Sequence, residues 1–152
     1  MRRYGPLHVV DGVLLIGDPG RRHLRLLPSA LVHAGEDAVR PVVWDDVTSV
    51  VLDLPTTRFR LPGMAAGLAD SALVLLAGDG FSPDVADGRA ILHTRDEAVD
   101  LPVSRHHFGA YWDRTVRSAQ RLLDRLIADP DSRALLDRPE ALLDTVVTAT
   151  RA

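Results

Sequence analysis

The stretch Ser104–Ile127, SRHHFGAYWDRTVRSAQRLLDRLI, carries the clearest periodic pattern in the chain. Arginines and aspartates take much of one side of this pattern, and Asp129-Pro130 ends it because proline disfavours helical geometry at the preceding residue. Ser104 is of a residue type that favours helix N-caps. The other side repeats at three- and four-residue intervals, which is typical of one face of an α-helix: Phe108, Tyr111, Trp112, Thr115, Ala119, Leu122, Leu123, Leu126 and Ile127. The sequence therefore predicts one long amphipathic helix that starts at Ser104 and covers a core.

The chain upstream of this helix consists of short apolar and β-branched runs separated by turn residues. Gly17-Asp18-Pro19-Gly20 predicts a tight turn that joins the first two runs as a hairpin. Proline and glycine also punctuate most of the later runs. We expect strands at Gly12–Ile16, His23–Leu27, Ala30–Ala34, Val42–Trp44, Val47–Leu52, Asp70–Ala77, Arg89–Thr94 and Ala98–Val103.

Composition narrows the class of protein. The chain has 152 residues, of which 46% are hydrophobic and 26% charged, as expected for one globular domain. Cysteine is absent, so disulfides, thiolate catalysis and zinc–thiolate sites are excluded. The net charge is -3 with no basic block, which argues against nucleic-acid binding. All 18 basic residues are arginine, a bias typical of GC-rich genomes, and no transmembrane or signal segment is predicted.

Two shorter helices are predicted after the long one. Asp131–Asp137 and Pro139–Ala149 carry apolar residues at helical spacing, and Pro139 suits a first helical position. We interpret residues 1–128 as the main domain and residues 129–152 as a helical extension that packs on it. A sheet of short strands leaves an open end of its core, and a following helix can cover that end.

This order of elements resembles the pleckstrin-homology-like (PH-like) fold, in particular that of bacterial PH-like domains. The resemblance covers residues 8–128 and rests on the early hairpin, on Pro41–Leu52 with Trp44-Asp45-Asp46-Val47 at its centre, and on the helix carrying Trp112. It implies a mainly β fold with a C-terminal helix: a small barrel or sandwich of about seven antiparallel strands capped by one long helix. It also implies a binding or scaffolding module and not an enzyme.

The candidate ligand-binding residues are Arg21, Arg22, His23 and Arg25, in and after the first hairpin turn. In phosphoinositide-binding members of this family the comparable loop grips phosphates with basic residues, and guanidinium groups match phosphate oxygens well. Asp18 lies in the same turn, however, and a solvated turn is the favoured interpretation. Anionic-headgroup or phosphate binding is the sharper alternative.

Histidines and paired acids offer a second possibility. His106 and His107 are adjacent, so they point about 100° apart on a helix and do not form a helical metal pair. We expect one to be partly buried and hydrogen-bonded. Asp45-Asp46 and Asp96-Glu97 fall at predicted turns, where aspartate caps backbone amides. The two tryptophans are interpreted as core anchors.

The sequence thus favours a non-catalytic, cytoplasmic module that binds a protein partner. An anionic headgroup is the second candidate ligand. No catalytic residue, metal site or cofactor is predicted. One alternative is a small ligand-binding barrel or enzyme that uses His93, His106 or His107 with a carboxylate near Trp112. Another is a peripheral membrane subunit attached through Met1–Tyr4. The oligomeric state is left open.

Overall fold

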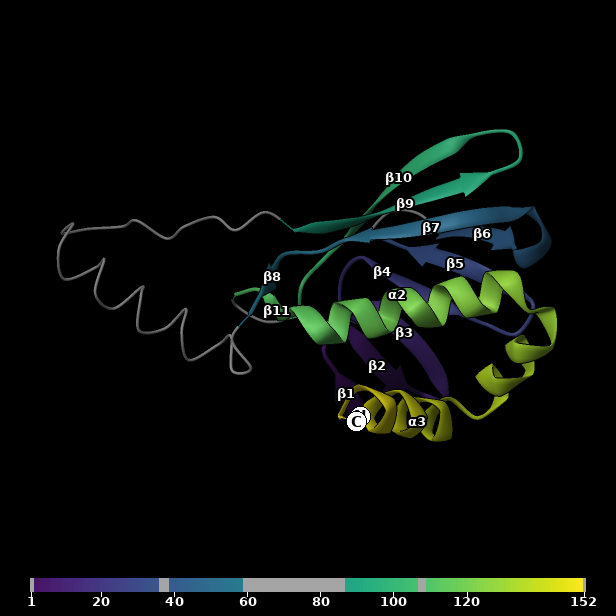
Figure 1. The fold of residues 1–152 in the computed structure, drawn as a ribbon. Coiled ribbons are helices and arrows are strands. Elements are labelled where there is room, and N and C mark those ends of the chain that lie inside the picture. Colours follow the sequence, from purple (N-terminus) through teal and green to yellow (C-terminus); the bar gives the residue numbers. More distant parts are fainter. Residues whose placement is uncertain (1, 36–38, 59–86, 107–108, 152) are drawn as a thin grey trace, which may run out of the picture.

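The computed structural model describes residues 2–35, 39–58, 87–106 and 109–151 (Figure 1). Its strands are β1 Arg2–Tyr4, β2 Leu7–Val10, β3 Val13–Gly17, β4 His23–Leu26, β5 Ala30–Ala34, β6 Val39–Val43, β7 Val47–Asp53, β8 Thr56–Thr57, β9 Gly88–Thr94, β10 Ala98–Val103 and β11 Tyr111–Trp112. Its helices are the 3₁₀ turns η1 Trp44–Asp46 and η2 Pro130–Asp137 and the α-helices α2 Asp113–Ala128 and α3 Pro139–Arg151. The predicted class, mainly β with helix at the C-terminal end, is confirmed.

The strands form two larger sheets and one short pair. β1 to β6 follow one another in a six-stranded antiparallel sheet, while β7, β9 and β10 form a three-stranded antiparallel sheet in the order β10-β9-β7. β8 and β11 pair in parallel. Within the described residues these hydrogen-bonded ladders do not close into a barrel. The predicted hairpin between β3 and β4 is confirmed, with Ile16 opposite Leu24.

A hairpin that we did not predict precedes β3. β2 pairs with β3 from Leu7 opposite Ile16 to Val10 opposite Val13, and β1 adds to the outer edge of β2. The turn is Asp11-Gly12, and both residues have positive φ, 50° and 73°. This is the backbone that tight two-residue hairpin turns require, and Asp-Gly suits it. Residues 2–4 are therefore an edge strand of the main sheet.

The two larger sheets meet along β10. Ser104, which directly follows β10, donates its amide to the Arg22 carbonyl at 2.8 Å and accepts from the Asp18 amide at 2.8 Å. His33 on β5 lies against β10, with its Nε2 2.8 Å from the Pro102 carbonyl. These contacts attach the three-stranded sheet to the end of the first sheet where β3 turns into β4.

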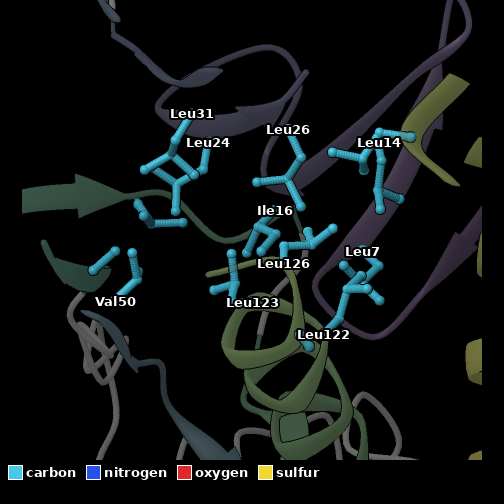
Figure 2. Close-up of a cluster of buried hydrophobic side chains, with 14 of the residues drawn as sticks. Leu7, Leu14, Ile16, Leu24, Leu26, Leu31, Val50, Leu122, Leu123 and Leu126 are labelled. Carbon is cyan, nitrogen blue, oxygen red and sulfur yellow. The ribbon is translucent and has the colours of Figure 1, made fainter. Parts of the chain in front are cut away.

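Helix α2 packs its apolar face onto the strands, as predicted for the C-terminal part of the periodic stretch. Figure 2 shows Leu122, Leu123 and Leu126 directed towards leucines of the six-stranded sheet. Leu123 and Leu126 are fully buried, and burial of each leucine stabilises the fold by roughly 1.5–3 kcal/mol. The buried residues of α2 are Thr115, Val116, Ser118, Ala119, Leu122, Leu123 and Leu126.

Gln120 of α2 bonds to the backbone of β7. Its Oε1 accepts from the Leu52 amide at 2.9 Å, and its Nε2 donates to the Val50 carbonyl at 2.7 Å. The side-chain amide thus pairs with β7 as a neighbouring strand would. Because unpaired strand edges invite association with other chains, this contact also protects the edge.

The start of the long helix was predicted wrongly. α2 begins at Asp113, nine positions after Ser104, and Ser104 is a fully buried residue held at the end of β10. Gly109 has φ +102°, which is not helical, and Tyr111–Trp112 extend alongside Thr56–Thr57. Strand pairing therefore replaces the first turns of the predicted helix.

The two tryptophans differ in environment. Trp44 is 1% exposed, and its Nε1 donates to the Leu27 carbonyl at 2.8 Å, so its role as a core anchor is confirmed. Trp112 is only half-buried and lies in β11, immediately before α2. Its predicted place on the apolar face of the helix is therefore wrong.

The C-terminal helices cover further core surface. Leu136, Leu142 and Leu143 join the same buried cluster as the strands and α2, and α3 lies beside β1 and β2 (Figure 1). Arg2 of β1 pairs with Asp144 of α3. Pro139 is the first residue of α3, as predicted. The predicted strand at Asp70–Ala77 lies outside the described residues.

Candidate functional site

The turn between β3 and β4 carries the arginines that the sequence marked as ligand-binding residues. Gly17 has φ +106°, and the Asp18 carboxylate accepts from the Gly20 amide at 2.9 Å. The Arg21 amide donates to the Asp18 carbonyl at 3.1 Å and completes the turn. Arg21 and Arg22 follow at its exit. Asp18 therefore shapes the turn through the backbone and leaves both guanidinium groups to other partners.

Asp87 is the partner of both arginines. Its carboxylate lies 3.0 Å from Arg22 Nη2 and 3.7 Å from Arg21 Nη2, and it accepts from the Ser104 hydroxyl at 3.1 Å. Arg22 Nε donates to the Ser104 hydroxyl at 3.3 Å, so three side chains form a closed set of contacts. The side chain of Arg22 therefore has a structural role: it binds the β3–β4 turn to the end of β10.

The electrostatic balance at Asp87 favours the charged form. Partial burial tends to raise the pKa of Asp87, but the amide hydrogen bond from Arg105, the Ser104 hydroxyl and the charges of Arg21 and Arg22 together lower it below the usual value. The carboxylate therefore neutralises much of the positive charge that the sequence suggested for this turn. Arg21 keeps the looser contact, and its side chain is 49% exposed.

The four predicted ligand-binding residues do not form one cluster in the described contacts. Arg21 and Arg22 share Asp87, whereas His23 directs Nδ1 to the Arg21 carbonyl at 3.1 Å. Arg25 lies on β4 opposite Val32, and its side chain makes no hydrogen bond or ion pair with another described residue. Arg21 is the most exposed member of the predicted set.

A buried histidine, His8, contacts a half-buried one, His106, near this turn. His8 is fully buried, and its Nε2 is 3.0 Å from Nδ1 of His106, which is also 3.0 Å from the Tyr111 hydroxyl. One histidine of the His106-His107 pair was predicted to be partly buried and hydrogen-bonded, and His106 is that residue, while His107 lies outside the described residues. His8 was not predicted. The sequence did contain a signal for its burial, because His8 lies inside the apolar run Leu7–Val10.

Tyr111 titrates far from its usual range. Burial raises the pKa of Tyr111 to about 12, with further increase from Asp18 and Asp87, while the His106 amide and Arg105 oppose the shift. The hydroxyl therefore stays protonated at physiological pH. It serves as a neutral hydrogen-bonding group for His106.

The raised pKa of Tyr111 predicts a loss of stability in alkali. The folded-state pKa lies above the unfolded value near 10, so the stabilising effect is complete below pH 10 and is lost as the pH rises to about 12. Over that window we expect wild-type stability to fall by about 1.4 kcal/mol per pH unit relative to Tyr111→Phe. Chemical denaturation of both proteins across this range measures the difference, and parallel curves would contradict the assignment.

The other polar groups singled out in the sequence serve turns and surfaces. Asp45 and Asp46 form η1, and Asp45 pairs with Arg133 at 2.8 Å. Glu97 follows β9 and pairs with Arg40. His93 lies on β9, opposite Ala98 on β10 and Ser49 on β7. It is not among the residues that contact His106 in the described part of the chain. No group of three or more His, Asp or Glu able to hold a metal ion occurs among the described residues.

No family model, curated protein or solved structure matches this chain. The described helices also include none with the length and apolar character needed to cross a membrane.

Proposed function

We propose that this chain is a non-catalytic binding module of the PH-like kind, and that its ligand is another protein. The observation that carries the proposal is the order of elements. β3 to β7, β9 and β10 give seven antiparallel strands in two sheets, and α2 follows and packs over the core between them. This arrangement supports a sandwich closed by a helix, as the resemblance implies. β1, β2 and the C-terminal helices are additions to it.

The polar chemistry of the described residues supports binding over catalysis. Arg22, Asp87 and Ser104 bind one another and hold two sheets together. The half-buried His106 and the buried Tyr111 lie within hydrogen-bonding distance of each other. Polar groups that bind one another in this way stabilise a rigid scaffold. Binding residues are then expected on the surface loops at the rim of the two sheets. We also propose a cytoplasmic location, with which a cysteine-free chain is compatible.

The rim at Arg21 is the first contact surface that we propose. A photo-crosslinking amino acid at position 21 is expected to capture one discrete protein in cells of the source organism. The same group at position 138, an exposed arginine before α3, is the control. Capture at position 21 alone supports the proposal. Identical adducts at both positions, or none at either, would contradict it.

An anionic headgroup is the second candidate, and the half-exposed Arg21 favours it. Arg21→Glu leaves the Arg22–Asp87 pair in place, so it tests the charge without removing the structural contact. Sedimentation with phosphatidylserine vesicles should then fall in Arg21→Glu and persist in Arg138→Glu. If the wild type does not sediment with the vesicles, the anionic headgroup is ruled out as the ligand. The proposal of a protein ligand is not affected by that result.

A further inference from the structure

Four exposed arginines lie along the solvent side of α2: Arg114, Arg117, Arg121 and Arg125. We call them the arginine stripe. At about 100° per residue they fall within an arc of roughly 80° and extend over roughly 16 Å of helix. Arg117, Arg121 and Arg125 are spaced i, i+4, where like charges destabilise an isolated helix. The stripe is thus a concentration of positive charge in a chain whose net charge is -3.

Most of this charge is not neutralised within the described residues. Arg117 pairs with Asp113 at 2.7 Å, but Arg114, Arg121 and Arg125 make no ion pair there. Arg114 instead lies over the Trp112 ring, with its Cζ 5.7 Å from the ring centroid. Arginines elsewhere, such as Arg22 and Arg89, are paired with aspartates. The stripe therefore presents guanidinium groups that are available to an external anion.

The stripe is also held on a rigid element. The opposite face of α2 is buried in the core, Gln120 anchors the helix to β7, and the Ser118 hydroxyl lies 2.7 Å from that of Thr150 on α3. A partner would not have to order the helix that it binds. Preorganisation of this kind reduces the entropic cost of association.

We propose that the arginine stripe binds an acidic segment of a partner protein through its carboxylates. Guanidinium groups bind carboxylates with two parallel hydrogen bonds, which gives such a contact a register. Asp113 and Asp124 lie along one side of the stripe, so a uniformly anionic surface such as a membrane or nucleic acid would also meet repulsion there. A peptide can place its acids on the arginines and away from both aspartates. This inference rests on the proposed binding function and names the chemistry of the ligand.

The test compares a glutamate-rich synthetic peptide and phosphatidylserine vesicles as probes of the full chain. The stripe variant is Arg114→Gln/Arg121→Gln/Arg125→Gln, which keeps Arg117 with Asp113. We expect the variant to bind the peptide about tenfold more weakly, as three exposed ion pairs would predict. Binding by the wild type should also weaken as salt is raised, because surface charges are screened.

The matched control removes the same charge from exposed arginines elsewhere: Arg3→Gln/Arg138→Gln/Arg151→Gln. It should bind the peptide within about twofold of the wild type, because these residues lie off the stripe. Equal loss in both variants, no binding by the wild type, or stripe-dependent binding to vesicles alone would overturn the proposal. Crosslinking at position 21 is a separate readout. If the stripe variant still captures a partner at position 21 and binds the peptide as tightly as the wild type, the stripe is not the binding surface. The proposed binding function would still stand in that case.

Discussion

Truncation of Leu123 to alanine is expected to lower the free energy of unfolding by about 3–4 kcal/mol, a large part of the stability of a domain this size. Leu123 is 0% exposed and lies at the centre of the contact between α2 and the strands (Figure 2). Its removal leaves a cavity that packed neighbours fill only in part. Urea denaturation followed by far-UV circular dichroism measures the change.

The control for this substitution is Leu135→Ala in η2. Leu135 is 42% exposed, so the same chemical change should cost about 1 kcal/mol or less. A similar, small effect at both leucines would mean that α2 does not pack where the structure places it.

Replacement of Gly5 by alanine is expected to cost about 2–4 kcal/mol. Gly5 has φ +57°, and a Cβ atom there would lie 2.1 Å from Thr115 Oγ1 and 2.3 Å from Thr115 Cβ. Rotation of the threonine cannot relieve the contact with its Cβ, so either the turn or α2 has to move. Thermal denaturation of the two proteins gives the difference.

Gly12→Ala is a matched control for Gly5→Ala. Gly12 also has positive φ, +73°, but a Cβ atom there meets nothing within 4 Å. Backbone strain alone should cost about 1 kcal/mol at this position. Equal losses at the two glycines would contradict the close approach of the β1–β2 turn to α2.

Local patterns predicted most of the strands. β5 and β10 have the predicted limits, and β3, β4, β7 and β9 differ from prediction by a residue or two. The N-terminal hairpin was missed although its signal was present. Asp11-Gly12 between the apolar runs Leu7–Val10 and Val13–Ile16 is a strong indication of a tight hairpin turn.

The start of α2 could not be read from local sequence. Apolar spacing continues back to Phe108, but Tyr111–Trp112 form a strand because they pair in parallel with Thr56–Thr57, which is distant in the chain. Tertiary pairing overrides helix propensity here. Only Gly109, inside the apparent helix, marked the break.

Only part of the candidate site could be predicted, because its contacts join residues that are far apart in the chain. The sequence identified Arg21 and Arg22 in a turn, but their shared partner Asp87 is about 65 residues away in the chain, and no local pattern connects them. His8 and His106 are likewise brought together only by folding. Residue types indicated the possible chemistry, and long-range packing decided which charges remain available.

The most direct test of the central claim, that α2 joins two sheets into one rigid binding module, is a nuclear Overhauser experiment on labelled protein. The account predicts cross-peaks from the Gln120 side-chain amide to the backbone of Val50 and Leu52, and from the Ser104 amide to Arg22. Absence of both sets in a folded protein would show that the helix and β10 lie elsewhere. That result would contradict the account.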